Sequence, residues 1–151
     1  MENEQLKQRM EELIPEAVYP ENKQFTEVIV PVDKLHVFCE DLKRSPDLLF
    51  DYLINLTAVD WKDHFMMVYH LVSTVYQHKV VVKTRIDDRE KPVVDTLADL
   101  WKTAEFQERE VYDLFGISFR NHPNLTRLFL DDDYGFPLRK DFEDESRMII
   151  K

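Results

Sequence analysis

Three consecutive strand-like segments with short connections constrain the fold of this chain more than any other feature. They span residues 54–61, 65–73 and 79–86. The middle segment is apolar on both faces, whereas the third alternates, with Val80 and Val82 on one side and Lys83 and Arg85 on the other. Connections this short reverse the chain, so we expect an antiparallel meander with the middle segment at its centre. One face of this sheet is expected to be buried and the other exposed to solvent.

Other elements are predicted around this meander. Apolar residues at helical spacing predict a helix over residues 4–14, a second after Asp33 as N-cap, and a third from Asp95 or Thr96 to Phe115, with a break near Thr103. Residues 25–30 favour a strand, and residues 48–53 a short helical turn. Since no β-α-β alternation is present, we expect a two-layer α+β fold: a small mixed or antiparallel sheet, helices on one face, and an extended C-terminal arm.

This pattern divides the chain into three parts. Residues 1–24 form an N-terminal helix and linker, residues 25–117 the α+β core domain, and residues 118–151 the extended C-terminal arm. A chain of 151 residues is long enough for one domain with a real core.

Composition excludes several classes of function. The net charge of −10 argues against direct binding to nucleic acid or to an anionic membrane, because both need a basic patch. The single cysteine, Cys39, cannot form a disulfide within the chain, an iron–sulfur cluster or a cysteine-based zinc site, and its apolar neighbours predict a buried thiol. No glycine-rich nucleotide loop, P-loop or nucleophile motif is present, and no apolar run reaches 18 residues. We therefore expect a cytoplasmic protein without a catalytic, cofactor or metal site of its own.

The most informative stretch covers residues 106–142. It contains both glycines of the chain, Gly116 and Gly135, and the prolines Pro123 and Pro137. It begins as an amphipathic helix and continues as a long segment in which turn residues separate apolar anchors. Such a segment cannot form a core alone, so we expect it to lie over its own domain or over a partner.

The helix at the start of this stretch places a carboxylate on its apolar side. Trp101, Ala104, Glu108, Val111 and Phe115 share one stripe at spacings of three and four. A buried carboxylate needs a partner or takes up a proton, and structural networks meet that need more often than catalysis does.

The remaining polar residues of the helix have other predicted roles. Glu105, Arg109 and Asp113 are spaced by four and predict an ion-pair ladder, whose expected role is to hold Arg109 for a contact elsewhere. Glu108 and Glu110 point about 200° apart, so they are not an acid/base pair. Gly116 is predicted to end the helix with a positive φ.

Three features of the arm suggest a ligand site, and for each a simpler interpretation is favoured. His122 before Pro123 has no second metal ligand at a suitable spacing, which favours a histidine hydrogen-bonded to backbone in a turn. The acidic run at residues 131–135 does not match the spacing of a calcium loop and is interpreted as a turn. The basic pair Arg139 and Lys140 is expected to form salt bridges with a partner or with this chain.

These residues together resemble a family signature. Its matching positions are Glu108, Arg109, Glu110, Asp113, Phe115, Gly116, His122, Pro123, Arg127, Pro137, Leu138, Arg139, Lys140 and Asp141. The pattern resembles the 30-kilodalton-type hydrophilic subunits of respiratory complex I, most strongly over residues 97–142. The end of the chain soon after the signature, at Lys151, resembles the stand-alone form rather than the form fused to the 49-kilodalton-type subunit.

The resemblance implies a function for the chain. Members are non-catalytic subunits of the peripheral arm of an NADH:quinone oxidoreductase, a translocase of the respiratory chain, on the cytoplasmic side of the cell membrane. They hold no flavin or cluster, which lie in partner subunits, and they pack on the 49-kilodalton-type subunit beside the quinone site. The resemblance implies that the arm from His122 to Phe142 is the main docking element.

Two other hypotheses remain open. The same signature occurs in related membrane-bound nickel–iron hydrogenases and in dehydrogenases that do not use NADH, and residues of this chain do not decide between these complexes. A different class is a free-standing hydrolase that uses Glu108, His122 and Asp141, which predicts turnover by the purified chain.

Overall fold

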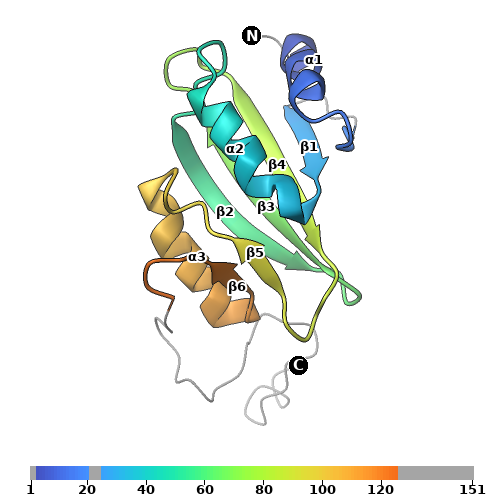
Figure 1. Ribbon diagram of the computed structural model, residues 1–151, viewed down its shortest axis with the longest axis vertical. Coiled ribbons are helices and arrows are strands. Elements are labelled where there is room, and N and C mark those ends of the chain that lie inside the picture. Colours follow the sequence, from blue (N-terminus) through green and yellow to red (C-terminus); the bar gives the residue numbers. More distant parts are fainter. Residues whose placement is uncertain (1–2, 21–24, 126–151) are drawn as a thin grey trace, which may run out of the picture.

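The structure is a computed structural model that describes residues 3–20 and 25–125 (Figure 1). Its elements in chain order are α1 (Asn3–Leu13), β1 (Thr26–Val30), the 3-10 helix η1 (Val32–Lys34), α2 (Leu35–Arg44), β2 (Tyr52–Asp60), β3 (Phe65–Val72), β4 (Lys79–Ile86), β5 (Val93–Asp95), α3 (Lys102–Phe115) and β6 (Ser118–Arg120). The predicted α+β class is confirmed. The division into 1–24, 25–117 and 118–151 stays a prediction, although β6, the first part of the predicted arm, pairs with the core.

The main sheet has four strands in the order β1-β4-β3-β2. Strands β2, β3 and β4 pair antiparallel in succession, as predicted, and β3 lies between the other two. Strand β1 joins β4 in parallel, with Val28 opposite Val82, so the sheet is mixed. The inward positions of β3 alternate with partly exposed ones along its whole length, which gives the sheet one buried face.

Helix α2 covers that face (Figure 1). It contributes Leu35, Phe38, Cys39 and Leu42 to the core, and burial raises the pKa of the Cys39 thiol far above its ordinary value. The cysteine is therefore buried, as predicted, and holds its proton. Helix α1 adds the fully buried Leu6 and Met10 near the β1 edge.

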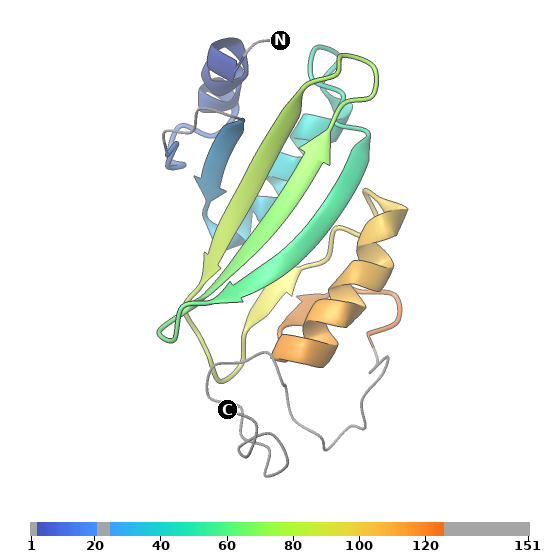
Figure 2. The ribbon, with the colours of Figure 1, turned by 180° about the vertical axis from the view of Figure 1, so that it is seen from behind.

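Helix α3 lies along the opposite edge of the sheet, beside β2 (Figure 2). Its side chains satisfy backbone groups of this edge strand. The Thr103 hydroxyl donates to the Leu53 carbonyl at 3.0 Å, and the Gln107 side-chain oxygen accepts from the Leu56 N–H at 2.6 Å. Just before the helix, the Trp101 indole donates to the Phe50 carbonyl at 3.0 Å. These bonds fix α3 against β2 and protect an edge that would otherwise expose unpaired groups.

Three local predictions are corrected, and two short strands were not predicted. Asp33 does not cap α2; it lies in η1, and the N-cap position is Lys34 without a side-chain cap. Residues 48–53 form a turn and the start of β2 instead of a helical turn. The third helix begins at Lys102, because residues 97–101 form a turn in which the Thr96 hydroxyl accepts the Ala98 N–H at 3.1 Å. The two strands that were not predicted are β5 and β6.

Gly116 ends α3 in the left-handed conformation, with φ 76° and ψ 17°. Its N–H donates to the Tyr112 carbonyl at 2.9 Å, which satisfies one of the last carbonyls of the helix. This confirms the predicted helix end. The turn directs the chain back so that β6 can pair in parallel with β5, with Phe119 opposite Val94.

Candidate functional site

Among the signature residues that the structure describes, Glu108 lies at the centre of the candidate site, in the middle of α3. Its side chain has no exposure to solvent, and the predicted stripe of Trp101, Ala104, Val111 and Phe115 is buried on the same side. The helical spacing therefore placed the carboxylate correctly. Its burial needs an explanation, because an ionised carboxylate in an apolar setting is costly unless it is paired.

The loop after β5 supplies the partners of this carboxylate. The Leu97 N–H donates to Oε2 of Glu108 at 2.8 Å, and the Thr96 hydroxyl donates to Oε1. The same Thr96 oxygen accepts the Ala98 N–H, so one side chain shapes the loop and contacts the acid. The result is a closed connection between the end of β5 and the centre of α3.

Burial raises the pKa of Glu108 to about 7. The hydrogen bonds from Leu97 and Thr96 act in the opposite direction, because they stabilise the charged form, and the negative charge of Asp99 adds to the increase. Desolvation is the largest of these effects. Glu108 is therefore divided between its neutral and charged forms near neutral pH.

The second polar side chain of the site is that of His122, which follows β6. Its side chain has no exposure, and its Nε2 lies 3.8 Å from Oε1 of Glu108. Nε2 also lies 2.9 Å from the Glu105 carbonyl, to which it donates, and Nδ1 accepts the Asn124 N–H at 2.9 Å. Because Nδ1 accepts, the donated hydrogen is assigned to Nε2. The prediction of a histidine bonded to backbone in a turn is confirmed.

We call Thr96, Glu108 and His122 with their backbone partners the α3 polar cluster. It joins three segments: the β5–α3 loop, helix α3 and the turn after β6. The side chains of Glu108 and His122 are shielded from solvent, and their polar atoms are held by other atoms of the chain. The arrangement suits a structural junction better than an acid/base pair acting on a substrate.

The other signature residues of α3 face different surroundings. Asp113 is fully buried, so the predicted ladder from Glu105 through Arg109 is not a surface row at its C-terminal end. This end of α3 packs into the domain, whereas Glu105 is exposed. Glu110 is half-buried and lines a hollow between α3 and β2, away from Glu108. The interpretation that Glu108 and Glu110 are not a pair is confirmed.

Several predicted site residues lie outside the described residues. These are Arg127, Pro137, Leu138, Arg139, Lys140 and Asp141, together with the acidic turn at residues 131–135. Pro123 is exposed in the turn that follows His122.

Sequence reasoning missed the partners of the acid. Thr96 and the Leu97 N–H are separated from Glu108 by a turn of unpredicted geometry, and the Glu105 carbonyl is a backbone group without a sequence pattern. Within residues 3–20 and 25–125, no group of three or more histidine, cysteine or acidic side chains is placed to hold a metal ion.

Comparison with protein families identifies the class of protein. The family model described as "Respiratory-chain NADH dehydrogenase, 30 Kd subunit" matches residues 28–147, which is most of the chain and includes all of the signature. The fold and the sequence therefore place this chain in a class of subunits of respiratory oxidoreductases. This chain belongs to the family of 30-kilodalton subunits of the respiratory-chain NADH dehydrogenase.

Relatives at 39% and 47% identity are named as subunits of NADH-quinone oxidoreductases. The C subunit of the NADH-quinone oxidoreductase of Moorella thermoacetica is 39% identical over 138 residues, which cover 89% of this chain and 91% of the relative. The C/D subunit of the NADH-quinone oxidoreductase of Phocaeicola vulgatus is 47% identical over 117 residues, or 76% of this chain. The matched region spans 22% of the length of that C/D protein.

Solved structures show the same fold. A chain in the structure of "the membrane-bound sulfane sulfur reductase (MBS), an archaeal respiratory membrane complex" aligns with a TM-score of 0.82 and 31% identity, over 96% of this chain and 88% of that chain. "Nqo5 of the trypsin-resistant fragment (1-134)" aligns with a TM-score of 0.67 and 28% identity, over 81% of this chain and 98% of the fragment. In the described part of the present chain, every helix is too short or too polar to cross a bilayer.

Proposed function

We propose that this chain is a non-catalytic subunit of the peripheral arm of a proton-translocating NADH:quinone oxidoreductase. In this proposal it holds the quinone-reducing module together by packing on the 49-kilodalton-type subunit, on the cytoplasmic side of the membrane. Flavin and iron–sulfur clusters lie in partner subunits. Family membership and the names of the relatives support the parent complex.

The α3 polar cluster is the observation that supports the scaffolding role. The signature residues that the structure describes are used for internal contacts, since Glu108 and His122 connect α3 with the turn after β6. His122 thereby fixes the last described turn, directly before residues 126–151 in the sequence. A segment that starts from a fixed point loses less conformational entropy when it docks, which favours binding.

A related complex is the second candidate. The structural similarity to a chain of an archaeal sulfane sulfur reductase complex favours it, because the same fold serves in a complex named for a different activity. The two candidates differ in the partners: flavin- and NADH-binding subunits for the first, and subunits of a hydrogenase or a non-NADH dehydrogenase for the second.

Co-purification tests the proposal. A tagged copy of the full chain is expressed in its own host, and the proteins captured from gently solubilised membranes are identified by mass spectrometry. Recovery of the 49-kilodalton-type subunit with the other peripheral-arm subunits is expected. Recovery of the folded chain without any subunit of a respiratory complex would overturn the proposed function.

A further inference from the structure

No described helix covers the second face of the main sheet, although Val81 of β4 is buried there. Helix α2 lies behind the sheet in Figure 2, and strands β2, β3 and β4 are in front. The outward positions of this face include Thr57 of β2, Val68 and His70 of β3, and Val81 and Lys83 of β4. We call this surface the open sheet face. Apolar side chains lie near its centre, because Met66 and Val68 of β3 point outward and are only half-buried.

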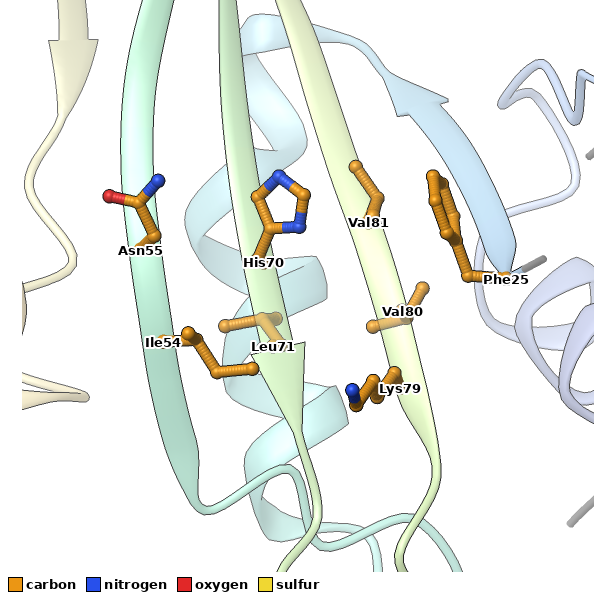
Figure 3. Close-up of a pocket in the computed structure, with 8 residues that line it drawn as sticks. All are labelled: Phe25, Ile54, Asn55, His70, Leu71, Lys79, Val80 and Val81. Atoms are coloured by element: carbon orange, nitrogen blue, oxygen red, sulfur yellow. The ribbon is translucent and has the colours of Figure 1, made fainter.

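The open sheet face contains two adjoining hollows. The first crosses β2, β3 and β4 near His70 and reaches Phe25, the residue before β1 (Figure 3). The second lies between β2 and α3, where Glu110 and the half-exposed Phe106 contribute to its wall. Asn55 lines both, so the hollows form one continuous surface from α3 to the start of β1.

A β-bulge shapes the centre of this surface. Leu53 pairs with Leu71 and Asn55 pairs with His70, so Ile54 is an extra residue in β2. As a result Ile54 and Asn55 are both exposed, while Leu53 is buried. A bulge of this kind places an extra apolar side chain on the outer face without disturbing the inner core.

The charge of the open sheet face differs from that of the chain. Although the chain carries a net charge of −10, the outward positions of β4 include Lys79, Lys83 and Arg85. Lys83 is paired with Glu27, and Arg85 with Asp87 at 2.5 Å. The exposed Lys79 forms no ion pair with any residue in the described ranges, so its positive charge is available to a partner.

We infer that the open sheet face is a second docking surface, separate from the arm, for a neighbouring subunit of the complex. The inference rests on the proposed function. The partner surface is apolar at its centre, where it covers Ile54, Val68 and His70, and carries carboxylates opposite Lys79. Apolar contact supplies affinity, and the carboxylate complement fixes orientation. A protein is favoured over an anionic membrane because a membrane surface needs a basic patch, whereas Lys83 and Arg85 are already paired with carboxylates and only Lys79 is unpaired among the described outward cations of β4.

Substitutions within the face provide the test. In the full chain expressed in its host, Val68→Glu places a charge in the apolar centre, and Lys79→Glu reverses the free positive charge. Val37→Glu is the matched control, because Val37 is 63% exposed on α2, on the other side of the sheet. Both face variants are expected to lower recovery of peripheral-arm subunits on the order of tenfold, while the control keeps normal recovery. Melting temperatures of the purified variants show whether each chain is folded.

The outcomes separate the inference from the proposed function. Normal recovery with both face variants would overturn the docking surface while leaving the proposed function intact. Normal recovery with Lys79→Glu alone would overturn the proposal that the partner places carboxylates opposite Lys79. If Val68→Glu does not fold, recovery with Lys79→Glu is the measurement that tests the docking surface. If the unsubstituted chain captures no respiratory subunit, the proposed function itself fails.

A vesicle experiment tests whether the open sheet face binds an anionic lipid surface instead of a protein. The purified chain is mixed with vesicles of phosphatidylglycerol and phosphatidylcholine and separated by flotation. The chain is expected to remain in the soluble fraction. Flotation of the unsubstituted chain that is abolished by Val68→Glu would assign the face to a lipid surface and overturn the protein partner.

Discussion

Nε2 of His122 lies 3.8 Å from Oε1 of Glu108, and neither side chain is exposed to solvent. Thirteen residues that include the helix end at Gly116 and strand β6 separate the two along the chain. Their proximity shows that the turn after β6 is fixed to the centre of α3. A change in either residue is therefore expected to affect both the domain and the segment that follows it.

Glu108→Gln tests the buried acid through the pH dependence of stability. The pKa of Glu108 is about 7 in the folded chain and near 4.5 ordinarily. Between these values the folded state binds a proton that the unfolded state has released, so this group lowers the free energy of unfolding as pH rises from 4.5 to 7. The total decrease is on the order of 3 kcal/mol.

The glutamine variant mimics the neutral form and should lack this decrease. Unfolding by urea at several pH values measures the difference between the two chains. Glutamine has only one acceptor oxygen for the two donors, so the variant can lose a constant amount of stability, but its free energy of unfolding relative to that of the unsubstituted chain is expected to increase as pH rises from 4.5 to 7. A difference that does not depend on pH would show that Glu108 has an ordinary pKa and that its burial is wrongly assigned.

His122→Ala tests the link between the cluster and docking. The change removes the bond to the Glu105 carbonyl and the acceptor of the Asn124 N–H, so a loss of about 1–2 kcal/mol in stability is expected. Recovery of partner subunits should fall further than this loss explains, because the start of the arm is no longer fixed. His64→Ala is the matched control, since the His64 ring bonds the neighbouring Asp63 carboxylate at 2.7 Å in the β2–β3 turn. Equal recovery with both variants would contradict the link.

The sequence predicted the elements of the fold that have a local side-chain pattern and missed those that depend on tertiary contacts. The meander and the buried stripe of α3 follow from side-chain periodicity over eight or more residues, so both were found. Strands β5 and β6 have three residues each and pair across the whole of α3, so no local pattern marks them. Asp95 or Thr96 was expected to begin the third helix, but the Thr96 hydroxyl bonds Glu108 and the turn before the helix.

Gly116→Val tests the end of α3. Because Gly116 has φ 76°, a β-branched residue there should destabilise the folded chain by about 1–3 kcal/mol. Gly116→Asn serves as the control, since asparagine tolerates this conformation better and should cost less. Thermal unfolding measures both. Equal melting temperatures for the valine and asparagine variants would mean that the left-handed conformation is not required.

Arg139→Ala with Lys140→Ala tests the basic pair of the predicted arm. These residues lie outside the described ranges, and the expectation comes from the family signature and from their charge in an acidic chain. The double variant should assemble less of the complex while the melting temperature of the isolated chain stays unchanged. A control variant exchanges the two basic residue types, Arg139→Lys with Lys140→Arg. It keeps both positive charges and should retain more assembly. Full assembly of the double alanine variant would remove the pair from the docking role.

The candidate site was predicted in part, for a physical reason. Burial of Glu108 follows from its position on an apolar stripe, and the backbone bonding of His122 follows from its place before Pro123 without other ligands nearby. That the two meet was not predicted, because it depends on the left-handed turn at Gly116 and on the pairing of β6 with β5. Tertiary geometry of this kind has no local sequence pattern.

The most direct measurement is native gel separation of membranes solubilised from cells that carry a tagged copy of the chain. Bands are stained for NADH dehydrogenase activity and analysed by mass spectrometry. We expect the tag in a large NADH-active band that also contains flavin-, cluster- and membrane-bearing subunits. A large inactive band with a nickel-ligating subunit would assign the chain to the related hydrogenases, and a lone chain that migrates by itself would contradict the account of a subunit.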